Sequence, residues 1–198
     1  MQRISVFCGS SMGSDKYYQE QAIIMANYLA DNNKSLVYGG ANIGIMKVLA
    51  DTMLSRGKEV IGVMPRSLAK KEIAHEGLTK MHLVKSMSDR KSLIVEISDA
   101  FIAFPGGMGT LDELSEVLTL NQIRVVDKPM GILNLKGYFN HFLSFVENAV
   151  NEGFMRKEHL NNLIVSDSID ELLIKMKAYR PIPMSDWIKD IKTESANK

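Results

Sequence analysis

The sequence predicts one doubly wound α/β domain, in which helices cover both faces of a parallel sheet. Two observations support this fold class. Short β-branched or aromatic runs alternate with segments whose apolar residues recur at helical spacing, and glycine-rich turns follow several of the runs. A length of 198 residues suits one domain. We expect the domain to span residues 1–180 and a polar C-terminal tail to follow at residues 181–198.

The first half of the chain contains three predicted strands separated by two helices. The strands are expected at residues 4–7, 35–38 and 60–64, and Pro65 ends the third. Ser14 or Asp15 can cap the first helix, whose apolar residues fall at i, i+3, i+4 and i+7 (Ala22, Met25, Ala26 and Leu29). The second helix repeats this spacing (Met46, Leu49, Ala50 and Met53), and Gly57 stands where a C-terminal cap is expected.

The second half continues the alternation after a charged stretch at residues 66–80, which we expect to be a loop with a helical turn. Further strands are predicted at residues 82–84, 100–104, 130–133 and 163–165. Ser86 or Ser88 opens the helix between the first two of these strands. Three more helices have apolar residues at helical spacing (Leu111, Leu114 and Leu118; Phe139, Phe142, Leu143 and Val146; Leu172, Leu173 and Met176). This order is typical of a Rossmann-like parallel sheet.

Composition excludes several classes of function. With 24 basic and 23 acidic residues the net charge is +1, which argues against a protein that coats nucleic acid through a broad basic surface. No apolar run approaches the roughly 20 residues of a membrane span, and the N-terminal apolar run is too short for a signal peptide. Cys8 is the only cysteine and the histidines lack metal-ligand spacing, so neither an intrachain disulfide nor a metal site is expected. We expect a cytoplasmic protein without a nucleic-acid or membrane partner.

Three glycine-rich turns follow predicted strands, at residues 9–13, 39–44 and 105–110. In doubly wound sheets ligands bind at the carboxyl ends of the strands, where such turns lie. The third turn, Pro105-Gly106-Gly107-Met108-Gly109-Thr110, opens a helix and can aim backbone N–H groups at a phosphate. It has neither the Walker A order nor the dinucleotide-binding pattern. The alternative is a tight turn that needs glycine only for its dihedral angles, and the density of glycine favours phosphate binding.

Glu113 allows two interpretations. Thr110 and Glu113 match a capping box, in which the carboxylate only bonds back to the start of the helix. Alternatively, Glu113 lies at the edge of the buried helical stripe beside the phosphate turn, where it can orient a water or act as a base. The pattern does not decide between them.

Arg90 occupies the first place of an otherwise apolar helical stripe that continues through Leu93, Ile94 and Ile97. A buried or half-buried arginine normally has an anionic partner. That partner is either a ligand or an internal carboxylate such as Asp99, unless the side chain reaches solvent at the helix end.

Two signatures resemble the LONELY GUY family of cytokinin-activating phosphoribohydrolases, long labelled "lysine decarboxylase-like". Residues 105–113 have the form PGGxGTxxE and residues 87–91 the form MxxRK, and Gly39-Gly40 follows the second strand. The resemblance covers residues 4–179 without departing from either signature. It implies hydrolysis of the N-glycosidic bond of a nucleoside 5'-monophosphate, adenosine monophosphate (AMP) or an N6-modified cytokinin ribotide, to free base and ribose 5-phosphate.

The resemblance also implies roles for single residues. Arg90 and Glu113 would be the catalytic pair, and the nucleotide would be bound by Glu72, Lys91, Gly106, Gly107, Met108, Gly109, Thr110 and Thr119. Thr119 lies six positions after Glu113 and faces another side of the helix, so it would reach a ligand across a subunit interface. The family forms dimers or larger homo-oligomers, and no cofactor is expected. Two rival functions are lysine decarboxylation, which needs a pyridoxal phosphate lysine, and a non-catalytic nucleotide sensor or carrier.

Overall fold

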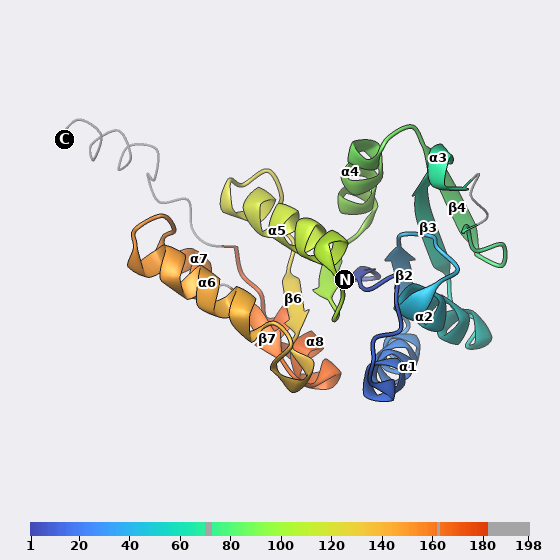
Figure 1. Cartoon of the computed structure of the whole chain (residues 1–198), viewed down its shortest axis with the longest axis horizontal. Helices are drawn as coiled ribbons and strands as arrows, with labels where there is room; N and C mark the ends of the chain where they lie inside the picture. Colours follow the sequence, from blue (N-terminus) through green and yellow to red (C-terminus); the bar gives the residue numbers. More distant parts are fainter. Residues whose placement is uncertain (70–72, 162, 182–198) are drawn as a thin grey trace.

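The computed structural model describes residues 1–69, 73–161 and 163–181. Within them the chain forms a seven-stranded parallel sheet (Figure 1). The strands are β1 (Arg3–Phe7), β2 (Ser35–Tyr38), β3 (Val60–Pro65), β4 (Lys80–Val84), β5 (Ala100–Ala103), β6 (Met130–Leu133) and β7 (Ile164–Ser166). Their order is β4-β3-β2-β1-β5-β6-β7, so the chain builds outward from β1 in one direction and then in the other. The predicted doubly wound α/β fold is confirmed, with its switch point between β1 and β5.

Helices cover both faces of the sheet. They are α1 (Lys16–Asp31), α2 (Gly44–Ser55), α3 (Arg66–Ala69), α4 (Met87–Ile97), α5 (Met108–Gln122), α6 (Asn140–Asn151), α7 (Lys157–Asn161) and α8 (Ile169–Lys177), with a 3-10 turn, η1 (Leu135–Gly137), before α6. One apolar core joins α1, α2 and α8 to the sheet, and a second joins α4, α5 and α6 to the opposite face. Figure 1 shows α1 beside α2 and α5 between α4 and α6.

The central strands are buried on both faces, which explains why their sequences are nearly continuous apolar runs. In β1, Ile4 and Val6 belong to the core under α1, whereas Phe7 belongs to the core under α5 and stacks on Phe101 of β5 with ring centroids 5.8 Å apart. The side-chain period of two places alternate residues on opposite faces. The sheet is therefore a rigid base whose carboxyl edge carries the turns.

The predicted elements are found with small shifts at their ends. Asp15 caps α1, because its carboxylate accepts a hydrogen bond from the Tyr17 N–H at 2.9 Å. Ser86 caps α4 in a capping box with Asp89. The sequence did not predict η1, α7 or an isolated bridge between Ala41 and Ala74, because short irregular elements have too few residues to show a period. The predicted tail, apart from Pro181, lies outside the described residues.

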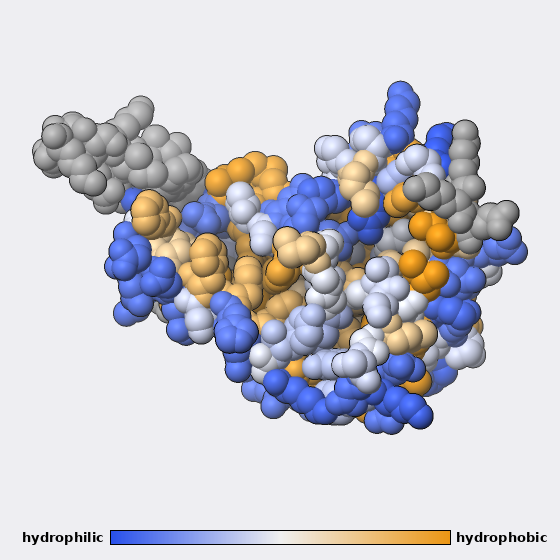
Figure 2. Space-filling view, in the orientation of Figure 1, coloured by the Kyte–Doolittle hydropathy of each residue, from blue (hydrophilic) through white to orange (hydrophobic). Residues whose placement is uncertain are grey.

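No described helix is long and apolar enough to cross a membrane. Polar and charged side chains cover α1 and α2 in the view of Figure 2, whereas apolar side chains reach the surface around α5 and α6. The large apolar residues exposed in this part of the chain include Ile123, Val125, Phe145 and Phe154. A soluble domain normally keeps such residues scattered or covers them with a partner.

Candidate active site

The glycine turn between β5 and α5 lies beside the turn that follows β1, at the switch point of the sheet. Gly9 N–H donates to the Pro105 carbonyl at 3.3 Å. Gly106 has no room for a side chain, because a Cβ there would lie 2.2 Å from Thr110 Oγ1 and 2.7 Å from Gly9 N. Gly107 precedes the first turn of α5, so the free N–H groups of that turn point out of the helix end. This geometry suits an anion.

A pocket of about 450 Å³ opens against this helix end. Its polar lining includes Arg90, Asp112 and Glu113, and the start of α5 contributes Gly107, Met108, Gly109 and Thr110. Much of the remaining lining is apolar, from Val6, Cys8, Ala41, Ile43, Met46, Met64, Leu68, Ile73 and Met87. The pocket thus combines a polar end with an apolar remainder, as ligand sites commonly do.

Arg90 and Glu113 meet inside this pocket. Arg90 Nη1 lies 2.7 Å from Glu113 Oε1, and the two side chains are only 12% and 10% exposed. Arg90 Nε donates to the Val63 carbonyl at 3.1 Å, which ties the guanidinium to the end of β3. Gly39 makes room for it, because a Cβ at that position would lie 2.6 Å from Arg90 Nη2. The guanidinium is thus bound by a carbonyl of β3 and a carboxylate of α5, and it lies against Gly39, which follows β2.

Burial raises the pKa of Glu113, and the adjacent Arg90 charge opposes this shift by favouring the ionised carboxylate. The Arg90 contact has the distance of an ion pair, yet Glu113 Oε1 accepts no hydrogen bond of good geometry from the described residues. Thr110 Oγ1 is also buried without a hydrogen-bond partner among them. Unsatisfied buried polar atoms are rare in folded proteins, and here two of them lie on residues that line one pocket.

The capping box considered for Thr110 and Glu113 is not formed. The helix is capped by the Gly107 backbone without a side-chain bond, and Thr110 lies within its first turn. The predicted internal partner Asp99 is also not used by Arg90, since its carboxylate accepts from the N–H groups of Gln2 and Arg3. Arg90 therefore has an internal carboxylate partner, which was one of the alternatives, but the partner is Glu113 and not Asp99.

Three of the remaining predicted contacts, Lys91, Thr119 and Gly106, do not line this pocket. Lys91 pairs with Asp112 at 3.1 Å and with Glu116 at 3.2 Å, on the α5 side of α4. Thr119 is exposed on α5 and donates to the Ser115 carbonyl at 2.8 Å. Gly106 forms the back of the turn and lines an adjoining pocket. Glu72 lies outside the described residues.

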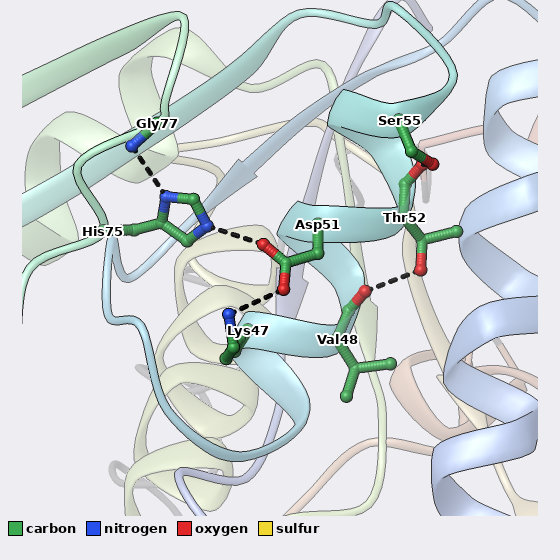
Figure 3. Close-up of polar contacts among 7 residues, drawn as sticks. All are labelled: Lys47, Val48, Asp51, Thr52, Ser55, His75 and Gly77. Atoms are coloured by element: carbon green, nitrogen blue, oxygen red, sulfur yellow. Dashed lines mark hydrogen bonds and ion pairs between the residues drawn. The ribbon is translucent and has the colours of Figure 1, made fainter.

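Cys8 and His75 are two further side chains near the site for which the sequence predicted no role. Burial raises the pKa of the Cys8 thiol and the Glu113 charge adds to the shift, so a thiolate nucleophile is disfavoured. His75 Nε2 lies 2.9 Å from Asp51 Oδ1, and its Nδ1 accepts the Gly77 N–H at 3.1 Å (Figure 3). This contact joins α2 to the segment that contributes Ile73 to the pocket wall. His75 and Asp51 are 24 positions apart, so no local sequence pattern could have predicted this contact.

Fold and site together define a doubly wound α/β protein with a glycine-rich helix N-terminus and a buried arginine–glutamate pair at the switch point. The family described as "Possible lysine decarboxylase" matches residues 46–176. The chain is similar to cytokinin riboside 5'-monophosphate phosphoribohydrolase LOG3 of Arabidopsis thaliana, with 42% identity over 90% of this chain and 83% of that protein. The probable enzyme of the same name, LOGL2, of Oryza sativa subsp. japonica is 42% identical over 90% of this chain and 73% of its own.

The chain therefore belongs to the LONELY GUY family, as its two signatures predicted. Solved structures agree on the fold. The molybdenum cofactor binding protein of Rippkaea orientalis superposes with a TM-score of 0.67 and 21% identity, over 89% of this chain and 96% of that one. The molybdenum cofactor carrier protein of Chlamydomonas reinhardtii gives 0.68 and 19% over the same shares. At these identities the likeness extends to the fold alone.

Proposed function

We propose that the protein hydrolyses the N-glycosidic bond of purine nucleoside 5'-monophosphates, either AMP or N6-modified cytokinin ribotides. Water adds across the bond, so that the base leaves with a proton and ribose 5-phosphate keeps the hydroxyl. The buried Arg90–Glu113 pair beside a helix N-terminus carries this proposal. The relatives named for this activity are about 42% identical over most of the chain.

The 5'-phosphate binds at the start of α5. Backbone N–H groups at Gly107, Met108 and Gly109 and the unpartnered Thr110 hydroxyl supply donors there, with the positive end of the helix dipole behind them. Gly106 lets the turn lie directly against Cys8 and Gly9, which follow β1. The apolar remainder of the pocket accepts the purine ring.

Glu113 stabilises the positive charge that develops on the ribose as the bond to the base breaks, and it orients the attacking water. This role requires an ionised carboxylate. Burial acts against ionisation, and Arg90 at 2.7 Å acts in its favour. Arg90 also lines the pocket, and its guanidinium holds the phosphate or ribose so that C1' meets the water in one geometry.

The second part of the proposal is a homodimer or larger homo-oligomer in the cytoplasm. Thr119 and Lys91 do not line the pocket of their own chain, so we propose that they contact nucleotide only in an assembled or rearranged site, together with Glu72. The exposed apolar residues around α5 and α6 support a subunit interface near Thr119. Mass measurement in solution tests this: a monomer at micromolar concentration would contradict it.

The lysine decarboxylase description of the family fits these residues poorly. Pyridoxal phosphate needs a lysine that can form a Schiff base in the pocket. No lysine of the described chain lines it: Lys91 is paired with Asp112 and Glu116, and Lys47 is paired with Asp51 at 2.7 Å. Neither has the neighbours that such a cofactor requires.

The test is incubation of the purified protein with a panel of nucleoside 5'-monophosphates, including AMP and an N6-prenylated derivative, followed by assay of free base and ribose 5-phosphate. Stoichiometric release of both products supports the hydrolase. Binding of a nucleotide without either product, at any pH between about 5 and 9, would replace it with the sensor or carrier function.

A further inference from the structure

Tyr138 lies on the outer side of the glycine turn, away from the pocket that contains Arg90. Its hydroxyl donates to the Gly106 carbonyl at 2.7 Å, although the two residues are 32 positions apart. The ring forms one wall of a neighbouring cavity of about 420 Å³, which the turns after β1 and β5 also line. Tyr138 contributes nothing to the walls of the active-site pocket.

The segment that delivers Tyr138 is conformationally costly. Lys136 has φ +51°, a left-handed conformation that side chains other than glycine rarely adopt, and Gly137 follows with φ +70°. The conformation is stabilised from outside. Lys136 Nζ pairs with Asp15 Oδ2 at 2.6 Å and lies 4.2 Å from the centre of the Tyr17 ring. The strained turn is thereby tied to the start of α1.

The polar contacts of Asn134 hold the same turn. Its side chain accepts from the Phe139 N–H at 2.7 Å and donates to Asn140 Oδ1 at 2.9 Å. Tyr138 is 45% exposed, and its ring contacts Tyr18 and Phe139 edge-on, with ring centroids 5.9 Å and 5.3 Å apart. In this position, the hydroxyl of Tyr138 forms its polar contact with the Gly106 carbonyl. Backbone strain stabilised in this way is found where a group must be positioned.

The Gly106–Gly107 peptide links this contact to the active site. A peptide group is planar and trans, so its C=O and its N–H point in opposite directions. Tyr138 holds the carbonyl of this peptide from the outer cavity. The N–H of Gly107 belongs to the same peptide, and Gly107 lies between the two cavities and lines both the outer one and the active-site pocket. The Tyr138 hydrogen bond, by fixing the Gly106 carbonyl toward the outer cavity, therefore directs the Gly107 N–H toward the active-site pocket.

We propose that Tyr138 is a positioning residue for the phosphate-binding turn: its hydroxyl, presented by the strained turn at Lys136, orients the Gly107 N–H toward the 5'-phosphate. The inference rests on the proposed function for the identity of the ligand, but orthophosphate suffices to test it. Tyr138 acts on binding of a group remote from C1'. Its loss therefore removes binding energy that ground state and transition state share, which raises KM and leaves kcat unchanged.

The experiment compares Tyr138→Phe with Tyr18→Phe. Tyr18 contacts Tyr138 edge-on at 5.9 Å between ring centroids, so the control removes a tyrosine hydroxyl from the same cavity and keeps the ring contact. We expect Tyr138→Phe to raise the Kd of inorganic phosphate and of ribose 5-phosphate, and the KM of AMP, about five- to tenfold. We expect kcat within about twofold of the unmodified protein, and Tyr18→Phe within about twofold in every quantity.

Calorimetric titration with phosphate separates this inference from the proposed function. Equal phosphate affinity of Tyr138→Phe and the unmodified protein overturns the role of Tyr138, as does a loss of kcat without a change in KM. If the unmodified protein releases no base from any nucleotide but Tyr138→Phe still binds phosphate more weakly, the proposed activity fails and the positioning role stands. Lys136→Ala, which removes the ion pair to Asp15, is expected to weaken phosphate binding in the same direction.

Discussion

Gly39 has no side chain, and the Arg90 guanidinium occupies the space that a side chain at this position would fill. In Gly39→Ala the new Cβ would lie 2.6 Å from Arg90 Nη2 and 3.2 Å from Met46 Sδ. Both neighbours are the ends of flexible side chains, so the fold accommodates the methyl group and the guanidinium moves. Ordinary van der Waals contact begins near 3.4 Å, and the displacement is therefore about 0.8 Å.

The magnitude follows from the pair distance. With an effective dielectric constant near 20, lengthening a 2.7 Å separation between opposite charges by this amount weakens their attraction by about 1.4 kcal/mol. That is about a tenfold loss in rate if the pair acts in the transition state. Misplacement of the catalytic geometry adds to it, so we expect kcat/KM to fall about 10- to 100-fold while the thermal midpoint changes by no more than about 2 °C.

The assay is the initial rate of base release from the preferred nucleotide, measured in a double-mutant cycle. In an Arg90→Met background the methyl group introduced by Gly39→Ala has no guanidinium to displace, so this substitution should cost nothing further. Additive losses in the cycle, or a Gly39→Ala enzyme with unchanged kcat/KM, would refute the link between Gly39 and the placement of Arg90.

Two further predictions concern Glu113, and a third concerns the stability of the fold. Glu113→Gln should lower kcat at least about 10³-fold and leave the Kd of AMP within about threefold. Glu147→Gln, at an exposed position on α6, is the control, and retained turnover in Glu113→Gln would move catalysis to another residue. Because burial raises the pKa of Glu113 and the ionised form is the active one, kcat/KM should rise with pH through a pKa above the ordinary glutamate value, and Arg90→Met should move that limb to still higher pH; an unmoved limb contradicts the assignment. His75→Ala should lower the free energy of unfolding by about 1 to 3 kcal/mol, because the ring bridges Asp51 and the Gly77 N–H (Figure 3). Denaturant titration measures this change, and an unchanged unfolding midpoint would show that the bridge contributes no stability.

Local sequence patterns predicted the regular helices and strands. The strands around Ile4 and Ile102 are apolar runs followed by glycine, and α4 begins at a serine with an acidic residue three positions later. These features depend on neighbours within one or two turns, which is the range of helical and strand periods. The glycine turn at 105–110 was recognisable for the same reason, because strand, turn and helix are contiguous.

Contacts between distant segments were not readable in this way. The capping box at Thr110 and Glu113 has a valid local pattern and is not formed, because α5 starts at Met108 and Glu113 is drawn to Arg90. Nothing local distinguishes the two outcomes. The same holds for Tyr138, whose partner is the carbonyl of Gly106, and for His75, whose partner is Asp51.

The sequence alone determined the alternation of strands and helices, the glycine-rich turn that opens α5 and the two signatures that identify the family, because each depends on adjacent residues. Tertiary structure decided which groups meet. Winding the chain outward from β1 in both directions brings the ends of β1, β2, β3 and β5 to one edge. There the α4 arginine reaches the α5 glutamate, Gly39 leaves it room, and a tyrosine 32 residues beyond Gly106 holds the glycine loop from a strained turn. These meetings depend on strand order and side-chain volume, which act only once the sheet is assembled.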